Sequence, residues 1–313
     1  MILLRSMLYF PANNVRAAVK AATLLTDAVI FDLEDAVSID DKESGRILAG
    51  SLIKLVKRRG IHTFVRVNDL GTGLTTDDLN FTVTDGLDGV VLPKTERRSD
   101  VAEVSGMLDR VEKKGTLASE SVKLVPLIES AKGVVNACEI ASGSDRIVAV
   151  AFGAGDYCRD LGRDISSVSP EEIELLYARS HIVNASRAAG VMAIDTPFLG
   201  SLTDREAFLK EIDLAVRLGF KGKQCIHPSQ TEPVNKMFSP SPEEVSRASR
   251  IVDAFDQAQA RKIGVVAFEG KMVDLMTYRQ AKYVLETYER TAHRTAARKA
   301  LSVDLSEIFS ASR

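Results

Sequence analysis

Eight short apolar segments run along this chain of 313 residues, and all but one end in a polar or charged residue or have one directly before a final proline. Buried parallel strands have near-continuous hydrophobic sequences, and strand–helix alternation is typical of βαβ units. Helix-like stretches separate most of the eight segments. We therefore expect a closed (β/α)₈ barrel, the TIM-barrel fold of the α/β class. The expected strands are SMLYFP, DAVIFDLED, HTFVRVN, GVVLPK, KLVPLIE, IVAVAFGAGD, VMAIDTP and KQCIHP.

The chain length fits one barrel with an appendage better than two equal domains, because such barrels take about 250 residues. We expect the barrel core at residues 1–238 and a C-terminal helix with an arm or lid at residues 239–313. Within the arm, apolar residues recur at three- and four-residue spacing, which predicts a helix with one buried face. The residues of that face are Leu275, Tyr278, Ala281, Val284, Leu285 and Tyr288.

The composition, with 45% hydrophobic and 27% charged residues and a net charge of -2, excludes several classes of protein. A nucleic-acid-binding protein needs a clustered basic face, which this charge balance argues against. A membrane span needs about 20 apolar residues, and the apolar stretches of this chain are far shorter. The apolar N-terminus meets Arg5 at once, so it is read as the first strand and not as a signal peptide. Three widely spaced cysteines (Cys138, Cys158, Cys225) predict neither disulfides nor a thiolate metal site, and they favour the cytoplasm.

Polar side chains are expected to meet at one end of the barrel, where the strands have their C-terminal ends and such barrels have their active sites. Most of these side chains are carboxylates, accompanied by one arginine and one lysine. This mixture is typical of a site that binds a divalent cation and an anionic substrate. The residues are Asp32, Glu34, Asp35, Arg66, Asn68, Lys94, Glu129, Asp156, Asp195 and His227.

Glu129 and Asp156 end two neighbouring predicted strands, so their carboxylates can share one hard cation. Mg²⁺ usually takes only one or two protein carboxylates and keeps its other positions for water and substrate. The alternative is that each carboxylate caps a helix or pairs with a nearby base. The segment Gly153–Ala154–Gly155 precedes Asp156, and its backbone N–H groups can bind a substrate carboxylate at close approach.

Arg66 ends the third predicted strand, and its planar guanidinium suits a carboxylate or a developing enolate oxygen. The alternative, a buried salt bridge with the acids of the second strand, is compatible, because Asp32 would orient the guanidinium. At strand alternation Asp32 and Glu34 face one way, while Asp35 faces the other way or lies beyond the strand. We expect supporting roles for these three acids.

Lys94 and His227 have two interpretations each. Lys94 can be a Schiff-base lysine, but acidic neighbours raise the pKa of a lysine, which favours a positional role in the polar network. His227 can act as an acid–base group or as a ligand, although a single histidine beside a proline is more often structural.

Several longer motifs stand in a fixed order from RSMLYFP to GKMVD, which is almost the whole chain. They are DAVIFDLEDAV with the following DDK, VRVN, LPK, PLIES, AFGAGD, DTPF, GFKGKQCIHPSQ and FSPSPEE. With these motifs the chain resembles the citrate lyase beta subunit-like group of HpcH/HpaI-type aldolases, which includes malyl-CoA and citramalyl-CoA lyases. The resemblance implies a (β/α)₈ barrel with a C-terminal arm and a homo-oligomer, either a trimer or a hexamer.

The resemblance also implies roles for single residues. Glu129 and Asp156 are similar to the Mg²⁺ ligands of the family, with Mn²⁺ as an alternative ion. Arg66 is similar to the residue that steadies the thioester enolate and the oxo-acid oxygens. Asp274 is similar to the acid–base aspartate that the arm delivers, often to a neighbouring subunit.

Arg16 and Lys20 match positions that contact coenzyme A phosphates in relatives. Two departures from the family pattern lie near these groups. PANN stands where many relatives carry Pro-Gly and a charged residue, and Leu275-Met276 follows the arm aspartate where Lys-Pro is frequent. The first departure concerns contacts to the thioester carrier, and the second concerns the geometry of the lid.

The implied activity is reversible cleavage of a 3-hydroxyacyl-CoA, such as malyl-CoA or citramalyl-CoA, to acetyl-CoA and a 2-oxo acid. The alternatives are a citryl-CoA or citryl-carrier-protein lyase, a malate synthase-like condensation with thioester hydrolysis, and an aldolase acting on free hydroxy-oxo-acids. A non-catalytic scaffold homologue would have lost the metal acids or the arm aspartate. The expected partners are small acyl-CoA and 2-oxo-acid molecules, with no nucleic acid and no membrane.

Overall fold

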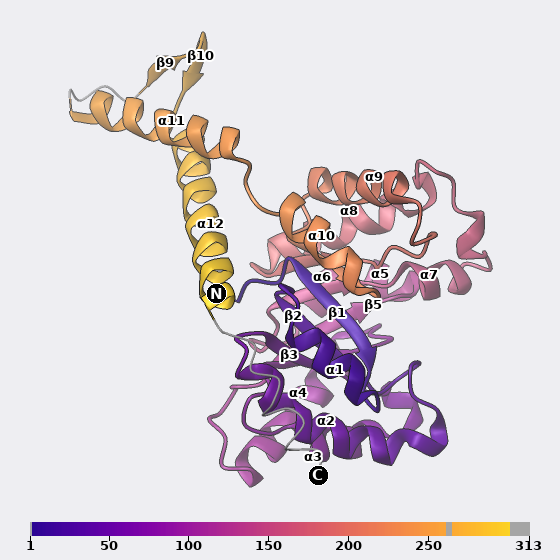
Figure 1. The fold of residues 1–313 in the computed structure, drawn as a ribbon. Helices are drawn as coiled ribbons and strands as arrows, with labels where there is room; N and C mark the ends of the chain where they lie inside the picture. The colour runs from indigo at the N-terminus through magenta and orange to yellow at the C-terminus, as the bar shows by residue number, and fades with distance from the viewer. Residues whose placement is uncertain (1, 261–264, 301–313) are drawn as a thin grey trace. The chain divides into compact units, whose positions relative to one another are not determined.

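The computed structural model describes residues 2–260 and 265–300. These residues form two compact units, with residues 2–235 in the first and residues 236–300 in the second (Figure 1). Residues 301–313 of the predicted arm lie outside the described part.

The first unit contains a closed barrel of eight parallel strands in sequential order, which confirms the predicted fold. Each of the eight apolar segments forms one strand, and β1 pairs with β8 to close the barrel, with Met7 opposite Gln224. The strands are β1 Ser6–Pro11, β2 Ala28–Asp32, β3 His62–Arg66, β4 Gly89–Leu92, β5 Lys123–Ile128, β6 Ala149–Phe152, β7 Met192–Asp195 and β8 Gly222–Cys225.

Helices connect successive strands. The main ones are α1 Val15–Ala22, α2 Lys42–Lys57, α3 Thr75–Thr82, α4 Arg98–Lys114, α5 Ala131–Val135, α6 Ala137–Ala141, α7 Ala154–Asp160, α8 Ile173–Ala188, α9 Arg205–Leu218 and α10 Thr231–Met237. Short 3₁₀ turns are η1 Ile39–Asp41, η2 Leu70–Thr72, η3 Ile165–Ser167 and η4 Pro228–Gln230.

The ends of these helices follow local sequence signals. The side chain of Asn14 accepts a hydrogen bond from the N–H of Ala17 and so caps α1. α2 is followed by Gly60, whose φ of 70° suits a residue without a Cβ at the end of a helix. The Ser-Pro-Glu-Glu segment before α8 is typical of a helix start, but α8 begins only at Ile173, because Glu172 has a left-handed backbone with φ of 52°.

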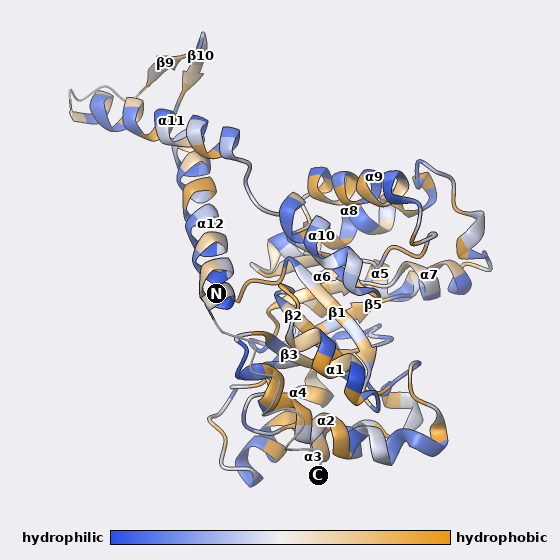
Figure 2. Ribbon diagram, viewed as in Figure 1, coloured by the Kyte–Doolittle hydropathy of each residue, from blue (hydrophilic) through white to orange (hydrophobic). Residues whose placement is uncertain are grey.

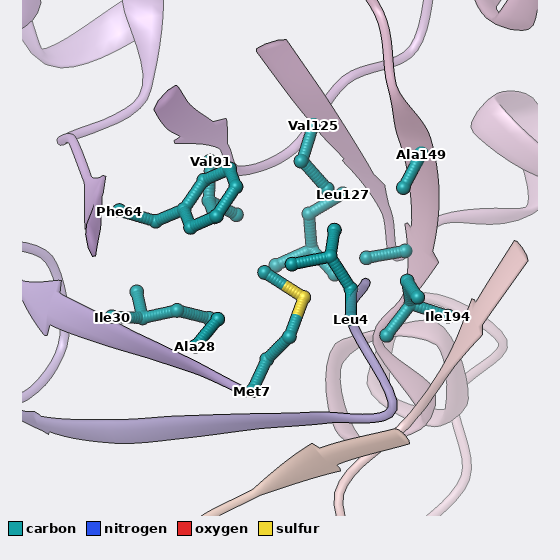
Figure 3. Close-up of a cluster of buried hydrophobic side chains, with 11 residues drawn as sticks. Leu4, Met7, Ala28, Ile30, Phe64, Val91, Val125, Leu127, Ala149 and Ile194 are labelled. Atoms are coloured by element: carbon teal, nitrogen blue, oxygen red, sulfur yellow. The ribbon is translucent and has the colours of Figure 1, made fainter. Parts of the chain in front are cut away.

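Apolar side chains fill the barrel interior (Figure 3). Met7, Ile30 and Phe64 come from the first three strands, and Val125 and Ile194 come from the opposite side of the barrel. The ring of Phe64 depends on Gly89 of the next strand, because a Cβ at position 89 would lie 2.6 Å from its Cε1 atom. In Figure 2 the barrel strands are mostly orange or pale, whereas the helices mix blue and orange residues.

The second unit consists of α11 (Pro242–Ala260), an antiparallel hairpin of β9 (Val266–Phe268) and β10 (Lys271–Val273), and α12 (Leu275–Ala300). α12 packs on α11 through Tyr278, whose ring stacks on Phe255 at 4.7 Å. The predicted apolar face is correct for its central part only. Leu275 and Tyr288 are 44% and 42% exposed, because the contact with α11 covers the stripe between them.

The three cysteines are not paired with one another. Burial raises the pKa of the Cys158 thiol and raises that of Cys225 to about 12, so both behave as small apolar core residues. Among the helices of residues 2–260 and 265–300, none has the length and hydropathy needed to cross a bilayer.

Candidate active site

A cleft of about 420 Å³ opens at the C-terminal ends of the barrel strands. Most of the polar residues predicted for the strand ends line it or contact a residue that does. The principal lining residues are Tyr9, Asp32, Asp35, Arg66, Glu129, Gly153, Gly155, Asp156, Thr196, Leu199, Gln224 and Ile226.

Arg66 is the most constrained cation in the cleft. Its Nε and Nη2 atoms donate to the two carboxylate oxygens of Asp32 at 2.8 and 2.6 Å, and its Nη1 atom lies 2.8 Å from Glu34 Oε2. The guanidinium also stacks over the ring of Tyr9, with its Cζ atom 5.1 Å from the ring centroid. Burial alone would lower the pKa of Arg66, but the hydrogen bonds and charge of Asp32 hold it well above its usual value. Arg66 is therefore a fixed positive charge.

Asp32 and Glu34 face the same way, toward Arg66, and Asp35 lies beyond the strand, as the sequence predicted, but Glu34 reaches the arginine from a loop and not from the strand. β2 ends at Asp32, so Glu34 and Asp35 lie in the loop that follows. Lys42 holds this loop, because its ammonium donates to the carbonyls of Leu33 and Glu34 at 2.5 and 2.6 Å. The loop turns Glu34 inward and leaves the side chain of Asp35 66% exposed at 3.6 Å from Arg66.

Lys94 bridges Glu129 and two further acids, Glu34 and Asp69. Its backbone N–H donates to Glu129 Oε1 at 2.7 Å, and its ammonium lies 2.8 Å from Glu34 Oε1 and 3.5 Å from Asp69 Oδ2. The backbone of Lys94 is left-handed, with φ of 48°, a conformation that points the N–H at Glu129. Burial would lower the pKa of Lys94, but its hydrogen bond to Glu34 and the surrounding carboxylates raise it. A Schiff-base lysine needs the opposite shift.

Glu129 and Asp156 both face the cleft. Glu129 is only 5% exposed, and burial together with the negative charges of Glu34 and Asp156 raises its pKa to about 8. Gly153 makes room for this carboxylate, because a Cβ at position 153 would lie 2.7 Å from Glu129 Oε2. Two carboxylates that repel one another in a buried cleft are stabilised when a cation binds between them.

Asp156 comes from the first turn of α7, where the helix dipole favours a negative charge. Arg159, an exposed residue on the next turn, contacts its carboxylate. The turn itself is anchored by the N–H of Ala154, which donates to Thr196 Oγ1 at 2.9 Å. This N–H is therefore already occupied by the protein, and so is that of Gly153, which donates to the carbonyl of Ile128 at 2.9 Å. The predicted backbone site for a substrate carboxylate is thus reduced to Gly155.

The donor set fits Mg²⁺ better than a transition metal. Within the described residues no three His, Cys, Asp or Glu side chains gather as a ready-made cage for a metal. Mg²⁺ does not need such a cage, since one or two carboxylates with water and substrate oxygens suffice. The buried, mutually repelling pair of Glu129 and Asp156 is consistent with this kind of binding.

Asp195 was expected at the mouth of the barrel, and the structure places it elsewhere. Its side chain is fully buried and contacts Lys223 at 2.8 Å and Arg179 of α8 at 2.9 Å. Glu211 of α9 joins the same cluster through Lys223 at 2.5 Å. Asp195 therefore faces the helices outside the barrel and stabilises the contact between β7, β8 and the helix layer.

Asn68 and His227 also have local structural contacts. The backbone N–H and the side-chain amide of Asn68 both donate to Asp78 Oδ2 at 2.7 Å. His227 is exposed, and its Nδ1 atom lies 2.7 Å from Ser229 Oγ, so it caps the short turn η4. This contact agrees with the structural interpretation of the histidine.

Sequence reasoning missed Tyr9 and Gln224. The hydroxyl of Tyr9 donates to Gln224 Oε1 at 2.8 Å, and the amide of Gln224 donates to the carbonyls of Phe152 and Asp195. These bonds hold the Tyr9 ring beneath Arg66. A polar amide inside the apolar run KQC was the signal that could have revealed Gln224.

Two further predicted residues, Arg16 and Lys20, do not line the cleft. They are exposed on α1, one helical turn apart. Asp274 belongs to the second unit, where it caps α12 by accepting from the N–H and hydroxyl of Thr277, both at 2.8 Å. These bonds lower the pKa of the Asp274 carboxyl and keep it ionised.

Comparison with known proteins agrees with this fold. Residues 5–228 match the model of the HpcH/HpaI aldolase/citrate lyase family. The chain belongs to this family.

Three relatives are informative. Citrate lyase subunit beta from Haemophilus influenzae is 40% identical over 91% of this chain and 97% of its own length. The (3S)-malyl-CoA thioesterase of Cereibacter sphaeroides is 32% identical, covering 92% of this chain and 95% of its own. The protein CitE from Mycobacterium tuberculosis, crystallised with magnesium, acetoacetate and coenzyme A, is 31% identical. It superimposes with a TM-score of 0.71 over 91% of this chain and 98% of its own.

Proposed function

We propose that this protein is a Mg²⁺-dependent carbon–carbon lyase that reversibly cleaves a 3-hydroxyacyl-CoA, such as malyl-CoA or citramalyl-CoA, to acetyl-CoA and a 2-oxo acid. The observation that carries the proposal is the placement of an acid pair, Glu129 and Asp156, and a fixed cation, Arg66, around one cleft. The magnesium, acetoacetate and coenzyme A found with the Mycobacterium tuberculosis relative support it.

Glu129 and Asp156 would hold the Mg²⁺ ion, with Lys94 N–H orienting the Glu129 carboxylate. A bound Mg²⁺ acts as a Lewis acid that withdraws charge from a chelated carboxylate and hydroxyl oxygen. The exposed side chain of Arg159 contacts Asp156 and has to move aside when this carboxylate becomes a ligand.

Arg66 would stabilise the enolate oxygen of the acetyl thioester. A guanidinium carries five N–H donors, and only part of them point at Asp32 and Glu34. The remaining donors are available to a substrate oxygen. Because Asp32 and Tyr9 fix the plane of the group, its charge needs no reorganisation as the enolate develops.

Two charged regions complete the proposal. Asp274, ionised at the start of α12, would exchange a proton with the acetyl carbon as a general acid–base group. Arg16 and Lys20, exposed on α1, would contact the phosphates of coenzyme A. We further propose that the enzyme works as a homo-oligomer in the cytoplasm.

A second candidate is cleavage of a citryl thioester, carried on coenzyme A or on a carrier protein. The 40% identity to a citrate lyase subunit beta favours it. A third outcome, hydrolysis of the thioester, is favoured by the relative named (3S)-malyl-CoA thioesterase. All three share the cleft and differ in the acyl group or in the bond that breaks.

A substrate panel tests the proposal. Purified protein would be given malyl-CoA, citramalyl-CoA and citryl-CoA, each with Mg²⁺ and with a chelator, and acetyl-CoA release would be measured. We expect Mg²⁺-dependent release from malyl-CoA or citramalyl-CoA, and little release from the Glu129→Ala or Asp156→Ala variant. Release from citryl-CoA alone would establish the second candidate, and release without Mg²⁺ would contradict the metal assignment.

A further inference from the structure

A second cavity, partly open to solvent, borders the active-site cleft. It measures about 830 Å³ and is lined by residues of α7, η3, α8, the loop after β7 and α9. Thr196, Pro197 and Leu199 line both this cavity and the cleft, so these three residues form the wall between them.

The residues of the wall differ in how firmly they are held. Thr196 is 2% exposed and is bonded to the N–H of Ala154, so it belongs to the barrel framework. Leu199, in contrast, is 46% exposed, and its apolar side chain forms no hydrogen bond that would fix it. Its Cδ1 atom would lie 3.4 Å from a Cβ placed on Gly155, which puts it against the residue directly before Asp156. A substrate held at Asp156 therefore has Leu199 beside it.

The lining of the cavity restricts what can enter. Apolar side chains such as Ile165, Val168, Leu175, Phe198 and Leu214 cover much of it. The charged lining side chains comprise five acids and two bases, and one of the bases, Arg179, is already paired with Glu172 and Asp195. An uncharged alkyl chain suits this surface, whereas a further carboxylate would meet predominantly negative charge.

We propose that Leu199 determines which acyl group this enzyme accepts, by closing the cleft against a cavity that fits an unbranched alkyl substituent of the 2-oxo acid. The inference rests on the proposed function and adds the substrate class. In the native protein Leu199 restricts the enzyme to short oxo acids. Without the leucine side chain, longer uncharged oxo acids extend past Asp156 into the cavity.

The test is the condensation direction, in which acetyl-CoA and one 2-oxo acid combine to a single hydroxyacyl-CoA with no further reactant. The probes are glyoxylate, pyruvate, 2-oxobutyrate, 2-oxovalerate and 2-oxoglutarate, used with Mg²⁺. 2-Oxovalerate and 2-oxoglutarate have the same chain length and differ in the terminal carboxylate. Ile226→Ala is the matched control, because Ile226 is an aliphatic residue of similar exposure (47%) that lines the cleft but not the second cavity.

Leu199→Ala should raise the ratio of kcat/KM for 2-oxovalerate to that for glyoxylate by about tenfold or more, since each methylene in a fitted pocket changes selectivity by about 10- to 200-fold. Ile226→Ala should leave this ratio unchanged, and 2-oxoglutarate should not gain with Leu199→Ala. An unchanged ratio in Leu199→Ala, an equal gain in Ile226→Ala or an equal gain for 2-oxoglutarate would overturn the inference.

If the native protein condenses none of the acids, the proposed function fails, and calorimetric binding of the same acids to the Mg²⁺-loaded proteins still tests the cavity. Tighter binding of 2-oxovalerate to Leu199→Ala than to the native protein would then support the inference that Leu199 closes the cleft against the cavity. Equal or absent binding to both proteins would overturn it.

Discussion

Both carboxylate oxygens of Asp32 accept hydrogen bonds from Arg66, at 2.8 Å from Nε and 2.6 Å from Nη2. The two side chains lie opposite one another in the register of β2 and β3 and are both largely buried. Bidentate pairing fixes the plane of the guanidinium as well as its position. The barrel thus supplies a charged group whose orientation is set before any substrate arrives.

Asp32→Asn should reduce kcat by about 10- to 100-fold. Without the bidentate carboxylate the guanidinium plane of Arg66 is no longer fixed, and displacing a catalytic group by about 1 Å has an effect of this order. The substitution should also lower the free energy of unfolding by about 2–4 kcal/mol, since Arg66 keeps its charge and loses its main partner. Steady-state kinetics and urea unfolding measure the two effects. The control is Asp35→Asn at an exposed carboxylate 3.6 Å from the same arginine, where a change of about 0.5 kcal/mol or less is expected. Equal effects of the two variants would show that the pairing geometry is unimportant.

Glu129→Gln should stabilise the metal-free protein while removing its response to Mg²⁺. The pKa of Glu129 is raised in the folded protein, so above the ordinary glutamate pKa folding must either protonate this carboxylate or bury its charge, and an uncharged amide removes that cost. The gain at pH 7 should be about 1–3 kcal/mol. Thermal unfolding with and without Mg²⁺ measures both effects, because a bound ligand raises the Tm. Asp160→Asn, at the end of α7, should keep the Mg²⁺ response, and a Glu129→Gln protein that still responds to Mg²⁺ would exclude Glu129 as a ligand.

Asp274→Asn separates the catalytic role of this residue from its role as a helix cap. Asparagine caps helices as well as aspartate does, so the thermal stability of α11 and α12 should not change. Without the carboxylate, turnover should fall by about 10²- to 10⁴-fold, the usual contribution of a general acid–base group. Circular dichroism and kcat are the two measurements. Turnover close to that of the native protein would exclude proton transfer by Asp274.

Asp88 should make the stability of the barrel depend on pH in the acid range. Burial alone would raise the pKa of Asp88, but His62, Lys57 at 2.5 Å and the N–H of Thr63 lower it to about 2. Because the pKa is lowered in the folded protein, the stabilisation is complete above the ordinary aspartate value and is lost as the pH falls through about 2. Asp88→Asn should therefore cost about 1–2 kcal/mol at pH 7 and roughly half as much at pH 3.

Urea unfolding of the native protein and Asp88→Asn at the two pH values checks this expectation. Asp85→Asn is the control, because Asp85 pairs with Lys54 at 3.4 Å on the exposed surface and should contribute little at either pH. A cost of Asp88→Asn that is the same at pH 3 and pH 7 would contradict the assignment.

The barrel could be predicted because its strands are buried on both faces and therefore form continuous apolar runs. The positions of Arg66 and Glu129 followed from the same rule, since each stands at the end of such a run. Asp195 occupies an equivalent position in its run, yet it faces the helices. Its partner Arg179 comes from α8, and Glu211, which shares Lys223 with Asp195, comes from α9, so this cluster depends on tertiary packing that no strand pattern contains.

Tyr9 and Gln224 are the reverse case, because they contribute to the cleft and were not predicted. Within its apolar run Tyr9 is indistinguishable from a core residue. The polar amide of Gln224 stands out in its run, but only the closure of the barrel brings β1 beside β8 and joins the two side chains. Strand alternation placed Glu34 on the same side as Asp32, but it could not reveal that Glu34 lies in a loop that Lys42 holds in place.

The most direct test of the central claim is to identify which bond of malyl-CoA breaks. Native protein, malyl-CoA and Mg²⁺ would be incubated, and acetyl-CoA, glyoxylate, malate and unesterified coenzyme A would be quantified over time. Carbon–carbon cleavage predicts acetyl-CoA and glyoxylate in equal amounts, before any free coenzyme A accumulates. Malate and coenzyme A in equal amounts, without glyoxylate, would show thioester hydrolysis and contradict the claim.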